Sequence, residues 1–207
     1  STHCISSAAS DVYKRQADYF LLPSSEEELS GILKICKNEE LPYFILGNGS
    51  NLLVSDQGYE GVIIQIYKQM NRVEITENEI HAQAGALLSV IANRAMEAEL
   101  TGFEFAAGIP GTLGGACVMN AGAYGGEMKD VLETVTVLTR DGDVKTLTKD
   151  ELELGYRTSV IAKKDYIALS AVIRLENGKK EEIKAVMDDL KDCLLYTSDA
   201  ADDMQCV

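Results

Sequence analysis

Long apolar runs are missing from this 207-residue sequence. A membrane-spanning helix needs roughly 20 consecutive apolar residues, and no uninterrupted run approaches that length. A basic segment followed by an apolar stretch, the pattern of a signal peptide, is missing as well. Because 46% of the residues are hydrophobic, which is enough for a sizeable core, we expect a globular protein in the cytoplasm with no membrane partner.

Positive charge is also scarce. The sequence has 19 Lys and Arg residues against 33 Asp and Glu residues, which gives a formal net charge of -14. Proteins that bind a nucleic acid backbone use patches of Lys and Arg, and the sequence shows no basic stripe. We therefore expect a solvated acidic surface and no nucleic acid partner. Nothing in the sequence indicates a protein partner.

Cysteine and histidine form no recognisable site. Of the five cysteines, only Cys36 and Cys117 lie between residues 17 and 192. Neither has the CxxC or Cys/His spacing of a metal site, and two cysteines do not make a disulfide framework. We expect both to be buried as small apolar residues, and His81 to lie on a strand face without a partner. No metal site is predicted.

The two ends of the sequence differ from its middle. Residues 6–16 are what a common transposase-based sequencing adapter would encode, and the reverse complement of that adapter, read out of frame, encodes residues 193–202. One inverted oligonucleotide accounts for both ends, whereas two ordinary disordered tails would very rarely reproduce it by chance. We expect residues 1–16 and 193–207 to be adapter-derived tails, and exclude them from the fold.

Residues 17–70 predict a small βαββ lobe. The segment Ser24-Ser25-Glu26-Glu27-Glu28 places a hydroxyl three residues before a carboxylate, and apolar residues then recur at helical spacing, which is typical of a capped amphipathic helix. Residues 42–46 predict a short strand that enters a glycine loop, and residues 62–66 predict a buried strand.

Residues 71–192 predict a larger, mostly antiparallel lobe, so that the fold class is α+β. Two alternating strands over residues 73–84 precede a helix over residues 88–100, which Gly102 is expected to cap. Asp141-Gly142 predicts a hairpin turn. Further strands and a last amphipathic helix are expected over residues 134–139, 144–147, 166–175 and 179–190.

Glycine is concentrated in one segment of this second lobe. Residues 102–126 hold eight of the seventeen glycines, a density that turns alone do not explain. Glycine permits positive φ and lets backbone N–H groups approach a bulky anion, and the start of a helix adds a favourable dipole. Residues 108–116 are therefore suited to a pyrophosphate.

A second glycine segment, residues 47–53, follows a strand and adds Ser and Asn side chains. A lone GxGxxL loop is explained equally well by a tight strand-to-strand turn, but two glycine segments in one chain are stronger evidence for a phosphate ligand. Neither segment has the Gly-Lys-Ser/Thr of a P-loop or a GxGxxG that opens a long helix. A kinase and a Rossmann dehydrogenase are therefore disfavoured.

Three segments in order and spacing resemble one family: ILGNGSNLLVSD, GFEFAAGIPGTLGGACVMNAGAYGGEM and ELGYRTSVI. They are similar to motifs of the MurB family of UDP-N-acetylenolpyruvoylglucosamine reductases, over nearly all of residues 17–192. The resemblance implies the two-lobed FAD-binding fold of the vanillyl-alcohol-oxidase (PCMH) type, with FAD between the lobes. Because no His or Cys lies in either glycine segment, we expect FAD to be bound non-covalently. The residues expected at FAD are Gly47, Asn48, Gly49, Ser50, Asn51, Leu52, Gly108, Ile109, Pro110, Gly111, Thr112, Gly114, Gly115, Ala116, Asn120, Ala121, Gly122, Ala123, Tyr124 and Gly125.

The resemblance also implies a reaction. NADPH reduces FAD, which then passes hydride to the enolpyruvyl double bond of a UDP-sugar, so that UDP-N-acetylmuramate forms for peptidoglycan synthesis. Tyr156 and Arg157 match the family's YRxS motif, in which the guanidinium would bind the substrate carboxylate and stabilise developing negative charge. A lone Arg after Tyr, without this resemblance, is typical of an ordinary surface residue.

One part of the family pattern has no counterpart in this sequence. The family's third domain binds substrate and carries a proton-donating serine and a glutamate, so we expect a FAD-binding fragment that is inactive alone. Two other interpretations are a non-catalytic flavin module and a FAD-dependent sugar or alcohol oxidase on the same fold. The pair Tyr156 and Arg157 favours the reductase.

Overall fold

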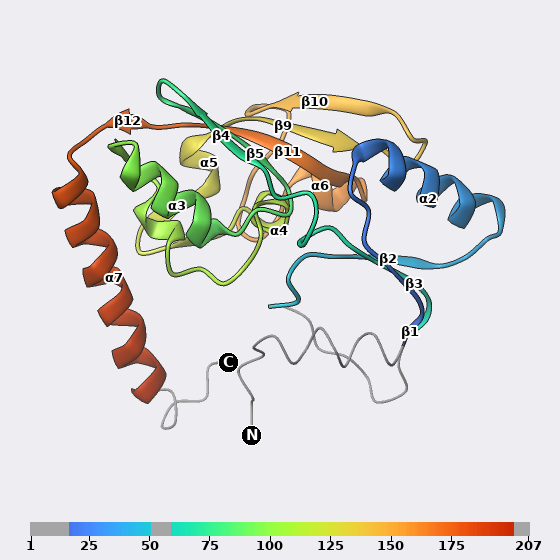
Figure 1. Ribbon diagram of the computed structural model, residues 1–207, viewed down its shortest axis with the longest axis horizontal. Coiled ribbons are helices and arrows are strands. Elements are labelled where there is room, and N and C mark those ends of the chain that lie inside the picture. Colours follow the sequence, from blue (N-terminus) through green and yellow to red (C-terminus); the bar gives the residue numbers. More distant parts are fainter. Residues whose placement is uncertain (1–16, 51–58, 201–207) are drawn as a thin grey trace.

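The computed structural model describes residues 17–50 and 59–200, which form two larger β-sheets, two short two-stranded sheets and helices around them (Figure 1). The first sheet is parallel and has the spatial order β1 (Ala17–Leu21), β3 (Tyr59–Gln65), β2 (Tyr43–Leu46). The central strand β3 is buried from residue 61 to residue 65, as expected for a parallel strand covered on both faces. The predicted βαββ order is confirmed.

Helix α2 (Glu26–Asn38) connects β1 to β2 and is capped as its sequence predicts. The Ser25 hydroxyl accepts a hydrogen bond from the Glu28 N–H at 3.2 Å, and the Glu28 carboxylate accepts one from the Ser24 N–H at 2.8 Å. The first contact satisfies a donor that the first turn of a helix leaves free, and the second ties the residue before the N-cap to the helix. Leu29 and Cys36 are the buried residues of the helix, so that α2 covers the sheet with its apolar stripe.

The second sheet has five strands, in the order β10 (Val144–Thr148), β9 (Leu132–Leu138), β11 (Ile167–Arg174), β5 (Glu79–Gln83), β4 (Val73–Thr76). Every neighbouring pair is antiparallel. The predicted turn at Asp141-Gly142 joins β9 to β10, with Gly142 at a φ of 89°, and the predicted antiparallel lobe is thus confirmed.

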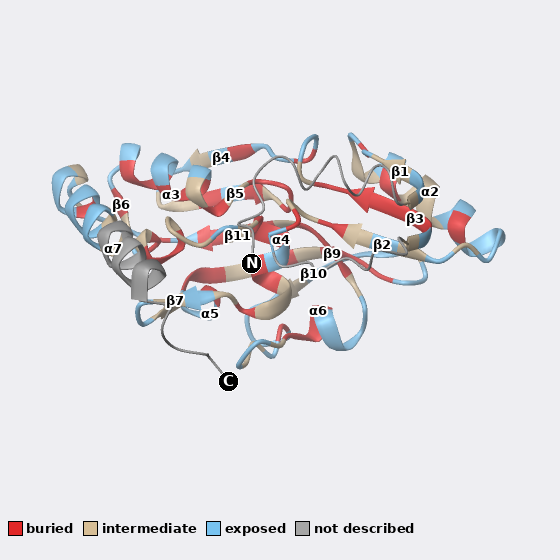
Figure 2. Ribbon diagram, turned by 90° about the horizontal axis from the view of Figure 1, so that it is seen from below, coloured by how far each residue is buried: buried red, intermediate tan, exposed pale blue. Residues whose placement is uncertain are grey.

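The remaining elements are mostly short, except for the last helix, which has 21 residues. They are α3 (Leu88–Glu97), β6 (Leu100–Thr101), η1 (Glu104–Ala106), α4 (Leu113–Met119), β7 (Gly122–Ala123), β8 (Gly126–Glu127), α5 (Met128–Val131), α6 (Val160–Lys163), β12 (Glu176–Asn177) and α7 (Lys180–Ala200). Helix α4 packs against β11 and β5, and the views in Figures 1 and 2 place α7 and α2 at opposite ends of the molecule.

Two predicted helix ends are wrong. Helix α3 ends at Glu97 instead of residue 100, and Ala98, not Gly102, is its C-cap. Glu99 then takes a φ of 58° and the chain enters β6, which pairs with β12. This long-range pairing ends the helix before the glycine. The last helix continues to Ala200, beyond the predicted residue 190.

Buried residues are concentrated in the central strands β3, β9 and β11 and in helices α3 and α4, and the red of β3 and β11 is seen in Figure 2. One apolar cluster extends from Leu29 of α2 to Ile173 of β11 and includes both predicted buried cysteines, Cys36 and Cys117. The two halves of the chain thus share a core. None of the helices in residues 17–50 and 59–200 combines the length and apolar character that crossing a bilayer requires. The lobe boundaries at residues 70 and 192 stay predictions.

Candidate functional site

The two glycine segments lie against each other, although 60 residues separate Ser50 from Pro110. The Ser50 hydroxyl donates a hydrogen bond to the Pro110 carbonyl at 2.8 Å. A Cβ atom added at Gly47 would lie 2.7 Å from the Thr112 Oγ1 atom, so the backbone at Gly47 passes directly over that side chain. The fold therefore brings the two sequence motifs into one site.

This site opens into a cleft of about 1110 Å³ that both sheets line. Ligand pockets are typically about 300–1,000 Å³, so the cleft has room for a ligand as large as a dinucleotide. The glycine segments form one part of the wall. Apolar side chains from the two halves of the chain form much of the rest, among them Leu41, Tyr43, Leu138, Ile161 and Ile167.

Gly115 presents bare backbone to this cleft in the first turn of α4. Its position is exposed, and a Cβ atom added there would meet only the Thr112 Oγ1 atom, at 3.7 Å. The N–H groups of Leu113 and Gly114 donate to the carbonyls of Ala86 and Ala84, each at 2.8 Å. Among the described residues no acceptor is found for the Gly115 N–H, and the Thr112 side chain makes no capping hydrogen bond. A donor at a helix start is thus available to an anion.

Other glycines of the dense segment serve packing. A Cβ atom at Gly114 would lie 2.9 Å from the Ala84 Cβ atom, one at Gly126 would lie 2.7 Å from the Phe105 ring, and one at Gly122 would lie 2.6 Å from the Gly126 carbonyl oxygen. These contacts let α4 approach β5 and close the β7–β8 hairpin. Part of the glycine density therefore has a structural cause.

The cleft contains many, but not all, of the residues predicted to contact FAD. Those that line it are Gly47, Asn48, Gly49, Ser50, Ile109, Pro110, Gly111, Thr112, Gly114, Gly115, Ala116 and Ala121. Those described but placed outside its lining are Gly108, Asn120, Gly122, Ala123, Tyr124 and Gly125. Asn51 and Leu52 lie outside the described residues.

Tyr156 and Arg157 form the tip of a tight turn away from the cleft lining. Gly155 and Thr158 exchange backbone hydrogen bonds of 3.1 and 3.3 Å across this turn, which leaves Tyr156 92% exposed. Arg157 is exposed as well, has a φ of 51° and makes no ion pair with any described residue. Its guanidinium is therefore available to a ligand.

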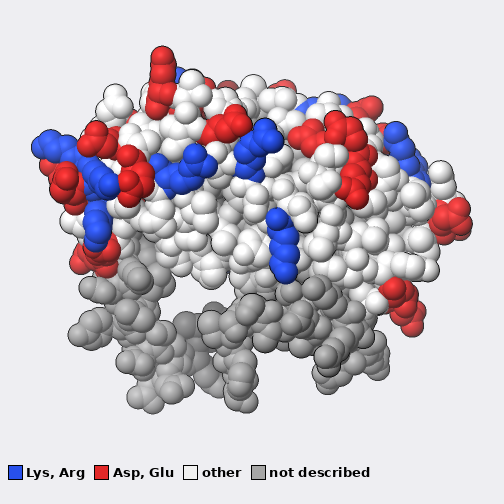
Figure 3. All heavy atoms as spheres, viewed as in Figure 1, with Lys and Arg blue, Asp and Glu red and all other residues white. Residues whose placement is uncertain are grey.

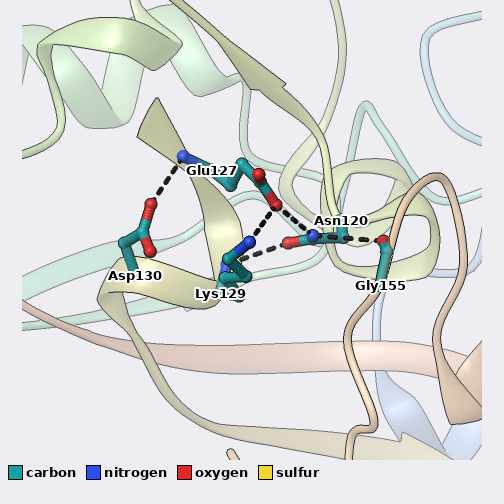
Figure 4. Close-up of polar contacts among 5 residues, drawn as sticks. All are labelled: Asn120, Glu127, Lys129, Asp130 and Gly155. Atoms are coloured by element: carbon teal, nitrogen blue, oxygen red, sulfur yellow. Dashed lines mark hydrogen bonds and ion pairs between the residues drawn. The ribbon is translucent and has the colours of Figure 1, made fainter. Parts of the chain in front are cut away.

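Asn120 lies between this turn and the β7–β8 hairpin (Figure 4). Its Nδ2 atom donates to the Glu127 carboxylate at 2.7 Å and to the Gly155 carbonyl at 3.2 Å. Its Oδ1 atom accepts from the Lys129 N–H at 2.9 Å. Both Nδ2 protons thus form hydrogen bonds within the protein. Asn120 as a whole residue is 6% exposed.

Glu127 also pairs with the Lys129 ammonium at 3.0 Å. The hydrogen bond from Lys129, followed by that from Asn120, lowers the pKa of the Glu127 carboxyl. A lowered folded-state pKa means that the charged carboxylate stabilises the fold above its unfolded pKa, and that this contribution is lost as the pH falls through the folded-state pKa.

We expect Glu127→Gln to lower the Tm at neutral pH and to have a progressively smaller effect as the solution is acidified through that lowered pKa. Thermal melts of the two proteins across the acidic range measure this difference. Glu176→Gln, at an exposed glutamate of β12, is the control. A Glu127→Gln effect that stays constant down to acid pH would contradict the assigned role of the carboxylate.

Neither described cysteine offers a reactive thiolate at the glycine segments. Cys117 is buried and does not line the cleft, and burial raises the pKa of its thiol to about 12. Cys36 does line the cleft, and burial raises the pKa of that thiol too. The described residues also contain no group of three or more His, Cys, Asp or Glu side chains placed to hold a metal ion.

The charged residues that line the cleft do not belong to either glycine segment. Lys37 of α2 reaches Asp141 of the β9–β10 turn at 3.9 Å, and Arg140 pairs with Asp165. On the molecular face in Figure 3, acidic and basic side chains are interspersed among the described residues, and no continuous basic stripe is visible. A bound phosphate would therefore rely on backbone N–H groups and hydroxyls.

Sequence reasoning missed one polar residue of the site, Gln65. It is 1% exposed, its Nε2 atom donates to the Gly47 carbonyl at 3.1 Å, and its Oε1 atom has no partner among the described residues. A lone polar residue in the apolar run of β3 was the available signal, because a buried amide needs hydrogen-bond partners.

Residues 17–148 match the family model described as the FAD binding domain. Among individual proteins, the chain is 51% identical over 174 residues to the UDP-N-acetylenolpyruvoylglucosamine reductase of Clostridioides difficile (strain 630), covering 84% of this chain and 57% of that protein. It is also 51% identical over 174 residues to the reductase of the same name from Alkaliphilus metalliredigens, with the same coverage. The chain thus spans less than two thirds of the length of these relatives.

A comparison with solved structures also finds a reductase of this name. The crystal structure of UDP-N-acetylenolpyruvylglucosamine reductase (MurB) from Thermus caldophilus matches with a TM-score of 0.72 and 35% identity, over 84% of this chain and 61% of that one. Alkyldihydroxyacetonephosphate synthase matches with a TM-score of 0.54 and 18% identity, over 76% of this chain and 31% of that one. The second likeness concerns the fold alone, which is the two-lobed type that the sequence predicts.

Proposed function

The chain belongs to the FAD binding domain family, and from this premise we propose that its cleft binds FAD non-covalently, with the pyrophosphate at the two glycine segments. The observation that carries the proposal is the bare backbone of Gly115, with its available N–H, beside the Ser50–Pro110 contact. Dinucleotides are held in this manner at helix starts and glycine loops.

The residues of the cleft fit FAD in further ways. Ser50 and Thr112 place hydroxyl groups beside the glycine backbone. The protein as a whole is acidic, and a wall of hydroxyl and backbone N–H groups can bind a pyrophosphate without repelling it. The apolar side chains toward Leu138 and Ile167 would cover a flat aromatic ring system and exclude water from it. The raised pKa values of the Cys36 and Cys117 thiols support a non-covalent mode of binding.

We propose further that the whole protein reduces UDP-N-acetylglucosamine enolpyruvate to UDP-N-acetylmuramate in peptidoglycan precursor synthesis, in the cytoplasm, where NADPH and UDP-sugars are made. FAD, when bound, would accept hydride from NADPH and pass it to the enolpyruvyl double bond. The names of the relatives and their 51% identity support this proposal. Under this proposal, the chain is part of an oxidoreductase.

Arg157 is the residue of this chain that we assign to the substrate. Its guanidinium has no protein counter-ion among the described residues and can bind a carboxylate through two parallel hydrogen bonds. Negative charge develops beside the substrate carboxylate during reduction, and a fixed cation there lowers the barrier.

A chimera tests the activity. Residues 17–192 of this chain would replace the matching segment of the Clostridioides difficile relative, and the product would be assayed for NADPH oxidation and for UDP-N-acetylmuramate by mass spectrometry. We expect both signals, at similar rates. NADPH oxidation coupled only to oxygen, without the UDP-sugar product, would contradict the proposed reaction while leaving FAD binding intact.

A further inference from the structure

We infer that Asn120 is the positioning residue of Arg157, because its side-chain amide ties the turn that carries Arg157 to the end of helix α4. The inference rests on the proposed function of Arg157. It assigns to Asn120 a contact within the protein, whereas the family resemblance implies that this residue contacts FAD.

The turn has few other attachments. The backbones of Gly155 and Thr158 are hydrogen-bonded to each other. The Gly155 carbonyl also accepts a hydrogen bond from Asn120 Nδ2 at 3.2 Å. On the far side of the turn, the Ser159 hydroxyl donates to the Val118 carbonyl at 2.6 Å. Both contacts reach the C-terminal end of α4, so this helix holds the turn on both sides.

Helix α4 also starts at the glycine segments, with Gly114 and Gly115 in its first turn. Its seven residues span about 10 Å at 1.5 Å per residue. A rigid helix thus separates the site proposed for the pyrophosphate from the turn that carries Arg157. Through its two anchors, α4 would fix the position of the guanidinium relative to the cofactor.

Asparagine suits this position for two independent reasons. Residue 120 is the C-cap of α4 and has a φ of 47° and a ψ of 55°, a left-handed conformation that asparagine tolerates better than most residues. Its amide also donates in two directions while accepting from the Lys129 N–H. Glycine adopts the left-handed conformation easily and aspartate tolerates it, but neither side chain has an amide group to donate to the Gly155 carbonyl.

Glu127 and Lys129 keep the amide in one orientation. The Glu127 carboxylate accepts from Asn120 Nδ2 at 2.7 Å and binds the Lys129 ammonium at 3.0 Å, so the amide nitrogen must point toward Glu127 and Gly155 (Figure 4). The reversed amide would place its oxygen against a carboxylate and a carbonyl. This network therefore directs the donor at the turn.

The test uses a fluorescent reporter at the tip of the turn. The sequence contains no tryptophan, and Tyr156 is 92% exposed, so Tyr156→Trp in the 207-residue chain gives a single reporter beside Arg157. Time-resolved anisotropy of this tryptophan, with and without FAD, measures the local motion of the turn. Melting temperature and FAD affinity are measured on the same samples.

Asn120→Gly in this background is expected to increase the amplitude of nanosecond motion of the tryptophan about twofold or more, with FAD affinity changed less than about threefold. Glycine keeps the left-handed backbone, so the chain should still fold. Asn120→Asp also lacks the amide donor but brings a second carboxylate against Glu127, so it is combined with Glu127→Gln and compared with Glu127→Gln alone. The double variant is expected to show the same added motion and decides the matter if the glycine variant does not fold. Asn93→Gly is the control. It removes a hydrogen bond from the Asn93 side-chain amide to the Ser89 carbonyl in α3, and should leave the motion of the tryptophan unchanged.

Unchanged tryptophan motion in both Asn120 variants would overturn the inference. So would a tenfold or greater loss of FAD affinity without added motion, because Asn120 would then be a cofactor contact. Failure of the parent chain to bind FAD at all would contradict the proposed function, while the anisotropy comparison without FAD would still decide the role of Asn120.

Discussion

Replacing Gly115 with valine is expected to abolish FAD binding and to leave the unliganded chain folded. The nearest atom to a Cβ at this position is the Thr112 Oγ1 atom at 3.7 Å, an ordinary contact distance, and valine is no worse than glycine in a helix. The added methyl groups would occupy the space that the pyrophosphate needs. We expect affinity to fall at least about 100-fold, or roughly 3 kcal/mol.

Its neighbour Gly114 gives the matched comparison. A Cβ there would lie 2.9 Å from the Ala84 Cβ atom, so Gly114→Val should lower stability by about 1–3 kcal/mol through overpacking. Gly31→Ala in α2, where a Cβ meets nothing within 4 Å, should leave binding unchanged and slightly raise the Tm. FAD titration and thermal melts separate the three variants. Normal FAD affinity in Gly115→Val would show that the cofactor does not approach α4.

Replacing Arg157 with glycine is expected to remove most of the turnover of the chimera while keeping or raising its stability. Glycine adopts a φ of 51° without the cost of about 1–2 kcal/mol that a side chain incurs in the left-handed region. Loss of a charge that stabilises a transition state typically lowers kcat by about 10² to 10³. Stability and activity should therefore change in opposite directions.

The measurement combines steady-state kinetics of the chimera with melts and flavin spectra of both proteins. Arg157→Lys is the control, since it keeps the charge but not the planar fork, and should recover only part of the activity. Activity close to that of the parent in Arg157→Gly would contradict the assignment of this arginine. An altered flavin spectrum would instead indicate a change at the cofactor.

Elements with local signals could be predicted from the sequence. These signals come from residues close to the element that they predict. They are the cap of Ser25 and Glu28 and the apolar stripe after it, which predict α2, and the Asp141-Gly142 turn, which predicts the β9–β10 hairpin. The composition of the two glycine segments also predicted phosphate contacts, and the family resemblance implied that both line one FAD site. The direct Ser50–Pro110 contact gives that prediction a structural basis.

Features that depend on distant residues could not be predicted. Helix α3 ends early because β6 pairs with β12, about 75 residues further along the chain. The family resemblance implied a cofactor contact at Asn120, whereas its side-chain amide donates a hydrogen bond to the Gly155 carbonyl, 35 residues away. Gly114 and Gly115 are adjacent and identical, yet only the structure shows that one packs on Ala84 and the other is open to the cleft.

The central claim is that the cleft between the two sheets is a FAD site, and equilibrium titration of the purified 207-residue chain with FAD tests it most directly. We expect saturable uptake of one FAD per chain with a Kd of about 1 μM or lower, a raised Tm, and full release of FAD on denaturation, as for a non-covalent complex. A chain that is folded by circular dichroism yet takes up no FAD and shows no change in Tm would contradict the account.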